Sequence, residues 1–444
     1  MPECATGSMR FAGRGPKPLD VDFLGGRLTS DGGLAWIAEA DTALGLTAAM
    51  AAVIPEWRAR CRHDLATLVA QRVYQIAAGY EDQDDADTLR SDPLLKQVCG
   101  RLPDSDPDLA SQPTFSRLEN AISARTCYRI AQAMGEVYLR ERERRGRPKR
   151  IVLDLDGTDD PTHGEQEGTA FHGFYGQYQY FPLLVFDGET DQLITAVLRP
   201  GTVHASHGTV AILTRIVRAI RTRWPKVVVE IRGDCGFAIP AVYAYCDREG
   251  IDYTIGLPRN PRLETLIAPL QAEAAQQSAA KDGAKVTLFG ETTYQADSWP
   301  KPRRVIMKAE MLKKGPNSRF VVTTKTQPPE EIYRHYTRRG ESENWIKDFK
   351  RGCFGDRLSC HRFLANQFRL LLHAAAYCVL DTLRRWLGSA GVARMTMETL
   401  RLRLIKVGGW VRERLRTVRL RLATSHPNEA WWRALATQRQ LAYE

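Results

Sequence analysis

The order of strand-like and helix-like segments between residues 151 and 257 constrains the fold of this chain more than any other feature of its sequence. Apolar runs of strand length are first separated by turns, and later alternate with segments whose apolar residues recur at helical spacing. The expected strands are 151–156, 180–186, 192–198, 227–232 and 251–257, and the expected helices are 209–223 and 240–248. The resulting order, βββαβαβ, predicts one sheet with both antiparallel and parallel neighbours, covered by helices.

A three-strand meander continued by alternating helices and strands is the order of the ribonuclease-H-like fold. We therefore predict an α/β protein with a ribonuclease-H-like core. Residues 259–328 interrupt it with a helical segment and three β-like runs, so we expect a β-rich insertion there. Helical patterns at 329–350 and 365–387 then complete the core.

The residues before 146 read mostly as short helices joined by Gly and Pro turns. Such helices form either a helix-turn-helix or an ordinary helical bundle, and the sequence leaves both open. The expected domains are an N-terminal helical domain (1–145), the first part of the core (146–258), the insertion (259–328), the second part of the core (329–388) and a basic C-terminal region (389–444).

Basic residues are concentrated in two stretches. The sequence carries 63 Lys and Arg against 52 Asp and Glu, a net charge of +11. Residues 140–150 hold seven basic and two acidic residues, and residues 384–422 hold eleven and two, so the rest is close to neutral. A positive charge focused in this way favours a polyanionic partner.

Two segments of the second stretch alternate apolar and basic residues, at 400–404 and 418–422. Alternation with period two predicts two strands, each with one apolar and one cationic face. The cationic face would consist of Arg401, Arg403, Arg419 and Arg421.

The sequence predicts neither export nor membrane contact. The longest apolar run, Leu370–Leu380, is too short to cross a bilayer and contains His373. The first fifteen residues lack the apolar core of a signal peptide. Nine scattered cysteines without a CxxC pair indicate reduced, buried thiols. We expect a cytoplasmic protein.

Two aspartates stand where expected strands end. Asp156 ends the first strand, and Asp234 follows the fourth between two glycines that let the backbone turn. Ligands gather at the carboxyl ends of strands in open α/β sheets, and Asp154 lies on the same strand face as Asp156. The alternative is a solvated acidic loop, since six Asp and Glu fall within residues 154–167.

A later segment carries a stripe of four functional side chains. Tyr336, Arg339, Glu343 and Lys350 recur at i, i+3, i+7 and i+14. At about 100° per helical residue, they fall within an arc of roughly 60°, opposite Trp345 and Phe349. The stripe places a carboxylate between cations, although an ordinary solvated helix face is the alternative and Gly340 interrupts the pattern.

These three carboxylates suit one chemistry. Asp and Glu supply hard oxygen ligands, without thiols or paired imidazoles, which suits Mg²⁺ or Mn²⁺. Two such ions, about 3.5–4 Å apart, activate an oxygen nucleophile and stabilise the leaving oxygen in phosphoryl transfer. Arg339 and Lys350 beside Glu343 would bind a phosphate.

The same residues resemble the DDE transposases of bacterial insertion sequences. Tyr336, Arg339, Glu343 and Lys350 match the spacing Y-x2-R-x3-E-x6-K, the YREK signature of the cut-and-paste branch. The stretches 79–82, 113–120 and 160–183 resemble the insertion-sequence thirteen-eighty group. The likeness runs from about residue 25 to residue 440.

This resemblance implies that Asp156, Asp234 and Glu343 are catalytic and bind two Mg²⁺ or Mn²⁺ ions. It also implies that Tyr336, Arg339 and Lys350 contact the DNA near the cleavage site. Further expected contacts to double-stranded DNA are Lys347, Arg117, Arg401, Arg403, Arg419 and Arg421. The N-terminal helical domain would bind terminal inverted repeats, and a homodimer would hold two transposon ends in a synaptic complex.

The function expected is a DNA transposase, associated with the bacterial nucleoid, that cleaves at its element's ends and joins the 3′ ends to target DNA. In the cut-and-paste branch a tryptophan of the insertion can stack on a flipped base, and Trp299 is the only tryptophan within 259–328. Two alternatives are a nuclease or resolvase of the same fold that cuts without joining, and a non-catalytic DNA-binding regulator.

Overall fold

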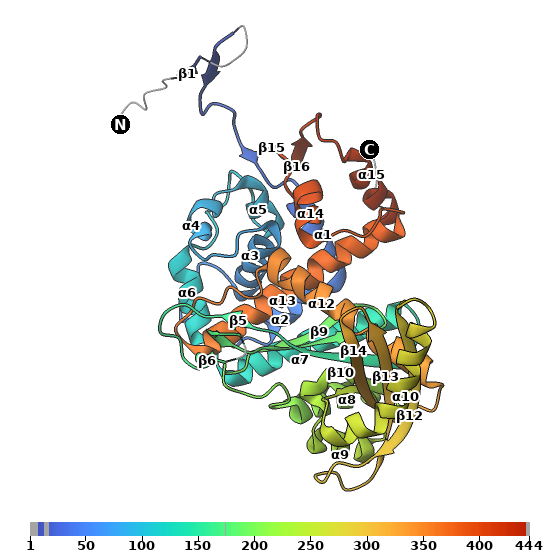
Figure 1. The fold of residues 1–444 in the computed structure, drawn as a ribbon. Helices are drawn as coiled ribbons and strands as arrows, with labels where there is room; N and C mark the ends of the chain where they lie inside the picture. The colour runs from blue at the N-terminus through green and yellow to red at the C-terminus, as the bar shows by residue number, and fades with distance from the viewer. Residues whose placement is uncertain (1–7, 13–16, 174, 441–444) are drawn as a thin grey trace.

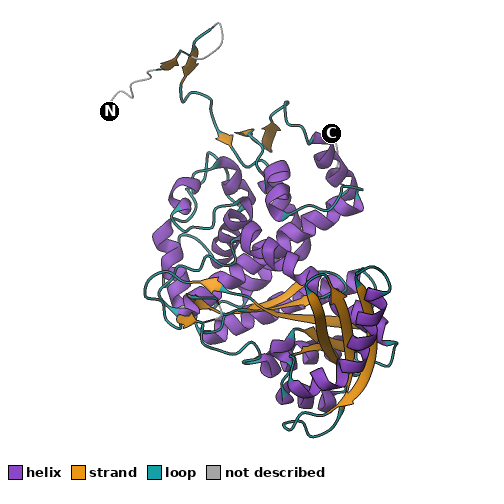
Figure 2. Ribbon diagram, in the orientation of Figure 1, coloured by secondary structure: helices purple, strands orange, loops and turns teal. Residues whose placement is uncertain are grey.

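The computed structural model describes residues 8–12, 17–173 and 175–440 (Figure 1). Its central feature is one eight-stranded sheet with helices on both faces, next to a larger group of helices (Figure 2). The strands of the sheet are β4 (Arg150–Gly157), β8 (Leu183–Asp187), β9 (Gln192–Val197), β10 (Val228–Gly233), β11 (Asp252–Leu257), β12 (Val286–Tyr294), β13 (Arg303–Leu312) and β14 (Gly315–Thr323).

The spatial order of the strands is β12-β13-β14-β11-β10-β4-β8-β9. β10 pairs in parallel with β4 and β11, and the other neighbours are antiparallel. The five strands expected between residues 151 and 257 stand side by side as β9-β8-β4-β10-β11. In order along the chain these are the third, second, first, fourth and fifth. The predicted mixed α/β sheet is therefore confirmed. Because β4 and β10 are parallel neighbours, residues that follow them reach the same edge of the sheet.

The β-rich segment 259–328 continues this sheet instead of forming one of its own. β14 pairs with β11 from Thr254↔Thr323 to Leu257↔Phe320, and β13 and β12 follow outward. α10 (Pro261–Ala279) packs on these strands from one side, where Val305 and Val322 point. Side chains alternate between the faces of a strand, so the neighbouring residues pack against α11 (Pro329–Thr337) on the other side.

Helices bury both faces of the sheet. α8 (Thr209–Arg223) and α9 (Pro240–Glu249) share a hydrophobic core with α10 and with the side chains of Leu153 and Ile231. On the opposite face, Phe186 belongs to a second core with α13 (Phe363–Ser389). The sheet is thus the middle layer of three.

The N-terminal helices share this second core with α13. They are α1 (Leu34–Leu44), α2 (Leu46–Ala52), α3 (Leu65–Ala78), α4 (Asp85–Leu89), α5 (Pro93–Val98), α6 (Gln112–Ala121) and α7 (Ala124–Arg144). α13 packs against α1, α3, α6 and α7 as well as against β9. Within the described residues, α13 alone is long and apolar enough to cross a bilayer, and 83% of its apolar window is buried inside the protein.

Smaller elements lie around these layers. They are β1 (Met9–Phe11), β2 (Leu19–Val21), β3 (Leu28–Thr29), β5 (Asp160–Pro161), β6 (Ala170–His172), β7 (Gln177–Tyr180), α12 (Gly340–Lys347), α14 (Met397–Leu400), β15 (Gly409–Glu413), β16 (Val418–Leu422) and α15 (Glu429–Gln438). β1 pairs with β2, β7 lies between β5 and β6, and β15 lies between β16 and β3.

One prediction about the C-terminal half is wrong, and another holds only in part. The strand expected at 400–404 is a π-helical turn, Arg401–Ile405. Leu404 and Ile405 follow Leu400 by four and five residues and all three are fully buried, which requires helical spacing because a strand would not turn them to one side. The helical structure expected at 329–350 is present, but it is divided next to Gly340 into α11 and α12, and a π-helical turn follows at Asp348–Gly352. The strand expected at 418–422 is confirmed as β16.

Candidate active site

Asp156 and Asp234 lie at neighbouring strand ends. Asp156 is the penultimate residue of β4, and Asp234 directly follows β10. The parallel register pairs Leu155 with Gly233, so the two aspartates come next on adjacent strands. The Gly236 amide donates a 2.8 Å hydrogen bond to Asp234 Oδ1, which holds this carboxylate at the start of a 3₁₀ turn.

Glu343 is brought toward these strand ends by α12. Trp345 of this helix is 1% exposed and packs on Phe186 of β8, with 5.3 Å between the ring centroids, which anchors the helix on the sheet. Ser342 Oγ donates a 3.1 Å hydrogen bond to Asp156 Oδ2. Glu343 is the next residue, is exposed, and its charge acts on Asp156.

The Asp156 carboxyl group is electrostatically coupled to three neighbours. Burial raises its pKa to about 6; the positive charge of Arg339 opposes this rise, and the negative charges of Asp234 and Glu343 add to it. Arg339 Nη1 lies 3.1 Å from Asp156 Oδ2. At neutral pH Asp156 is therefore ionised. Burial makes this charged form unfavourable, and the positive charge of Arg339 reduces that free-energy cost.

Tyr336 and Arg339 come from the last turn of α11 and the turn that follows it. Burial raises the pKa of the Tyr336 phenol, which also interacts with Arg339 and Asp234. Gly256 of β11 leaves room for this ring, because a Cβ at that position would lie 2.6 Å from the Tyr336 hydroxyl. The two side chains thus lie beside the same pair of aspartates.

Lys350 contacts the loop after β4 instead of the Asp156 carboxylate. Its ammonium group lies 2.9 Å from Asp159 Oδ1 and 3.7 Å from Asp356 Oδ2. Lys350 lies in the π-helical turn that follows α12, so the regular 100° step assumed from the sequence does not apply to it. Lys347, at the end of α12, is exposed.

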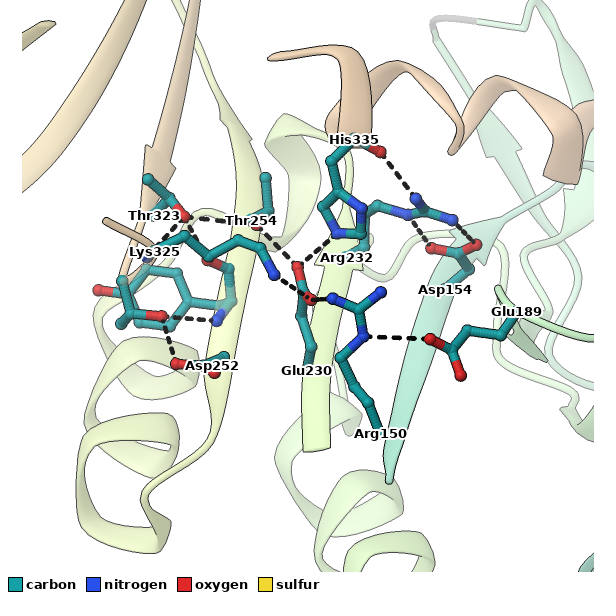
Figure 3. A network of polar contacts seen from close by, with 12 residues as sticks. Arg150, Asp154, Glu189, Glu230, Arg232, Asp252, Thr254, Thr323, Lys325 and His335 are labelled. Atoms are coloured by element: carbon teal, nitrogen blue, oxygen red, sulfur yellow. Dashed lines mark hydrogen bonds and ion pairs between the residues drawn. The ribbon is translucent and has the colours of Figure 1, made fainter. Parts of the chain in front are cut away.

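A buried polar network lies two residues before the carboxylates on each strand (Figure 3). Arg232 of β10 donates two hydrogen bonds of 2.6 Å to Asp154 of β4, its register partner, and both side chains are almost fully buried. A third hydrogen bond of 2.7 Å runs from Arg232 to the carbonyl oxygen of His335 in α11. Arg232 therefore joins both carboxylate-bearing strands to the helix that precedes Arg339.

Glu230 holds the side chain of the same histidine (Figure 3). Its carboxylate accepts hydrogen bonds of 2.7 Å from His335 Nε2, 2.7 Å from Lys325 Nζ and 2.9 Å from Thr254 Oγ1. Burial alone would raise the pKa of Glu230, but the bonds from His335 and Lys325 lower it to about 2. His335 is thus fixed through its carbonyl and through its ring, immediately before Tyr336.

The other predicted DNA contacts have different environments. Arg401 is 8% exposed and donates hydrogen bonds to the carbonyl oxygens of Ala77 and Gly352, so it belongs to the interior and not to a cationic face. Arg117 on α6, and Arg403, Arg419 and Arg421, are exposed.

Trp299 lies in the interior and not on the surface. Its side chain is 5% exposed and its ring packs against Tyr243 and Tyr294, with centroid distances of 5.1 and 5.5 Å. A ring packed in this way does not reach a DNA base, and the structure gives Trp299 a role in packing.

The network around Arg232 was not anticipated from the sequence, although a signal for it exists. Central parallel strands are buried on both faces and consist mainly of apolar residues. Glu230 and Arg232 break this pattern in the middle of β10, which indicates buried charges that need partners. Ser342 had no such signal, because serine is common at the start of any helix.

The donor set of this site fits a divalent cation in its chemistry. Asp156, Asp234 and Glu343 supply carboxylate oxygens, which Mg²⁺ and Mn²⁺ prefer, and the charges of Asp234 and Glu343 help to raise the pKa of Asp156 to about 6. The Cys235 thiol lies beside Asp234. Among residues 8–12, 17–173 and 175–440, no three Asp, Glu, His or Cys side chains lie close enough together to hold a metal ion. Arg339 is instead the cation next to Asp156.

Comparison with known proteins identifies the family. Residues 11–442 match the model of the transposase DDE domain, group 1. The chain belongs to this family of DDE transposases. The family assignment covers both the strand ends with Asp156 and Asp234 and the helix with Glu343, and it associates the chain with DNA transposition.

Solved structures and curated sequences add little to this assignment. The fold is similar to that of the piggyBac transposase in a synaptic complex with hairpin DNA, with a TM-score of 0.44 and 11% identity over 85% of this chain and 80% of that chain. No curated protein sequence matches.

Proposed function

We propose that this protein binds the terminal inverted repeats of its own insertion sequence, cleaves at the ends, and joins the 3′ ends to target DNA. The observation that carries the proposal is the coupling of Asp156 with Asp234 and Glu343 at one edge of the sheet, in a chain that matches the DDE transposase family along almost its whole length. Family membership supports the reaction class, and the three carboxylates indicate where on the protein the reaction would take place.

Asp156, Asp234 and Glu343 would hold Mg²⁺ or Mn²⁺ through carboxylate oxygens. A divalent metal bound there supplies the charge that activates an oxygen nucleophile and stabilises the leaving oxygen. Ser342 orients Asp156 by a hydrogen bond to Oδ2. Arg339, now 3.1 Å from that same oxygen, is in reach of any phosphate that approaches the carboxylates and would bind it with its guanidinium group.

Tyr336, Lys347 and Lys350 would complete the contacts to the DNA end. Lys347 is exposed and free to reach a phosphate. Lys350 is in an ion pair with Asp159, so its contact with DNA requires exchange of one anionic partner for another. The Tyr336 phenol, largely buried beside Gly256, would position Arg339 and donate a hydrogen bond at the edge of the site.

The architecture of the protein supports a ribonuclease-H-like core within this proposal. The strand order third, second, first, fourth, fifth, with the fourth parallel to the first, places the two aspartates on adjacent strands. Residues 146–258 and 329–388 would form that core, and 259–328 would be its insertion. The helices of residues 1–145, with Arg117, would bind the inverted repeats, and two copies of the chain would hold two ends, as in the YREK branch and the thirteen-eighty group.

The test uses the DNA that flanks the coding sequence. A labelled duplex carrying the short inverted repeat expected there is incubated with the protein, Mg²⁺ and a target plasmid. We expect cleavage at the repeat and recombinant joint molecules, both lost in Asp234→Asn. Cleavage without joints would support a nuclease or resolvase, and metal-independent binding without any product would support a regulator. Unchanged cleavage or joining in Asp234→Asn would remove the proposal.

A further inference from the structure

The hairpin formed by β15 and β16 has one face made almost entirely of arginines. The antiparallel register places Arg412 directly opposite Arg419, and Trp410 directly opposite Arg421. Because directly paired residues lie on the same side of an antiparallel sheet, these four side chains share a face. Arg414, two residues beyond Arg412, is close enough for the charges of Arg419, Arg412 and Arg421 to lower its pKa. We call Arg412, Arg414, Arg419 and Arg421 the arginine face.

The opposite side of the hairpin is packed against the protein. Val411 is 1% exposed, and Val418 and Leu420 pack on the core that contains the N-terminal helices. Glu413, the one acidic residue of the hairpin, also points to this side. It accepts hydrogen bonds from the amides of Asp104 and Ser105 and from the Ser105 hydroxyl.

The strand β3 completes this small sheet on its other edge, through Thr29↔Gly409 and Leu28↔Trp410. The hairpin is therefore held by both its apolar side and its edge, and the arginine face points outward. In Figure 1 it lies with the helical half of the molecule, at the opposite end from α9 and α10.

The arginine face is surrounded by cations and one aromatic ring. Across the described parts of the chain, no Asp or Glu forms an ion pair with any of its four arginines. Arg412 and Arg421 instead lie over the Trp410 ring, 5.8 and 5.7 Å from its centroid. Like charges placed opposite each other on a sheet destabilise it, so this arrangement opposes folding unless an anion binds.

The other basic stretch of the chain differs in this respect. Arg142 lies 3.3 Å from Asp187 and 3.4 Å from Glu189, and Arg150 lies 3.1 Å from Glu189. The pair of Arg142 with Asp187 attaches α7 to β8, and the pair of Arg150 with Glu189 joins the start of β4 to the turn after β8. Arg142 and Arg150 are therefore already paired with carboxylates of the protein, unlike the four members of the arginine face.

We propose that the arginine face is a second DNA-binding surface, separate from the carboxylate site, that binds the phosphates of duplex DNA. This inference rests on the proposed function for the choice of DNA as the polyanion. Successive arginines on one strand are two residues, or about 7 Å, apart, and each guanidinium presents a fork of donors to a phosphate.

The test measures the salt dependence of binding without catalysis. Wild-type protein and Arg412→Gln/Arg419→Gln are titrated with a fluorescent 40-base-pair duplex at several KCl concentrations in EDTA. Each lost phosphate contact lowers the slope of log K against log[salt] by about 0.9. We expect the variant's slope to be shallower by about 2, and its affinity for the duplex to fall at least tenfold at low salt.

The matched control is Arg248→Gln/Arg262→Gln, which removes the same charge. Both of these arginines are exposed and paired with a carboxylate, Arg248 with Glu249 and Arg262 with Asp297. The control should keep the wild-type slope. Thermal melting checks that the variant is folded. Because Arg412→Gln/Arg419→Gln removes the repulsion between these two arginines, its melting temperature should be equal to or above that of wild type.

A wild-type slope in Arg412→Gln/Arg419→Gln, or an equal change in the control, would overturn the inference. Tighter wild-type binding to single-stranded RNA than to the duplex, lost in the same variant, would also overturn it, because the surface would then serve another polymer. Failure of the wild type to bind any duplex would contradict the proposed function itself, so the two failures are distinguishable.

Discussion

Arg232 binds Asp154 through two hydrogen bonds of 2.6 Å, two residues behind the strand ends that carry Asp234 and Asp156. Both partners are almost fully buried, and the third contact of Arg232, to the His335 carbonyl oxygen, reaches the helix that leads to Arg339. The geometry of the carboxylate site therefore depends on a buried ion pair that itself takes no part in the chemistry.

Removal of one member of this pair should be costly. Arg232→Met leaves the buried Asp154 carboxylate without a partner, and the expected loss is about 3–5 kcal/mol in the free energy of unfolding. Asp154→Leu/Arg232→Met removes both charges and should recover most of that loss. Urea unfolding of the wild type, both single variants and the double variant measures the coupling. Additive effects would mean that the pair does not stabilise these strands as a unit.

The raised pKa of Asp156 has a consequence for stability. Its pKa is about 6 in the folded protein against 3.8 for an ordinary Asp, so the folded state holds more protons between these values and stability falls as pH rises from about 4 to 6. Asp156→Asn does not titrate. It should be more stable than wild type at pH 7.5 in EDTA, by up to about 3 kcal/mol, and the gain should vanish near pH 4.

Asp159→Asn is the control for this prediction, because it should change the stability at pH 7.5 in the opposite direction. Burial acts against the charged form, but Lys350 lowers the pKa of Asp159 overall, so this carboxylate stabilises the fold above its ordinary pKa and its loss should lower the melting temperature at pH 7.5. A melting temperature of Asp156→Asn at or below that of wild type at pH 7.5 would contradict the electrostatic description of the site.

Arg339 should determine the pH below which cleavage activity falls. Its charge lowers the pKa of Asp156, so Arg339→Gln should raise that pKa above about 6 and shift the acid limb of the pH–rate profile for cleavage to higher pH. Arg334→Gln, on the preceding helix, removes an exposed arginine paired with Glu330 and should leave the limb unchanged. An equal decrease in rate at all pH values in Arg339→Gln would indicate that Arg339 acts only through DNA binding.

The sequence was sufficient for the sheet but not for its outer part. Apolar runs bounded by turns located β4, β8, β9, β10 and β11, since each buried strand requires such a run. Neither β14 nor β11 carries a residue pattern that identifies the other as its partner, because the hydrogen bonds between them are formed by the backbone. The segment 259–328 therefore read as a separate insertion, and its place at the edge of the sheet emerged only from the structure.

The stripe of Tyr336, Arg339, Glu343 and Lys350 is likewise predictable only in part from the sequence. Trp345 and Phe349 are each 1% exposed, as expected for the side opposite the stripe. The 100° step per residue holds only in a regular helix, however, and the break before Gly340 and the π-helical turn after Lys347 direct Lys350 to Asp159. In the C-terminal region, period-two alternation located β16 but also suggested a strand around Arg401, where burial of Leu400 and Leu404 favours a helix.

The most direct test of the account asks whether Asp156, Asp234 and Glu343 act as one unit. Single-turnover cleavage of a labelled element end in Mg²⁺ is measured for Asp156→Asn, Asp234→Asn, Glu343→Gln and Asp156→Asn/Glu343→Gln. Each single variant should lose on the order of 10³-fold in rate, and the double variant should be no slower than the worse single variant, since residues that act as a unit are not additive. Multiplicative losses, or near wild-type cleavage in any single variant, would contradict a shared carboxylate site.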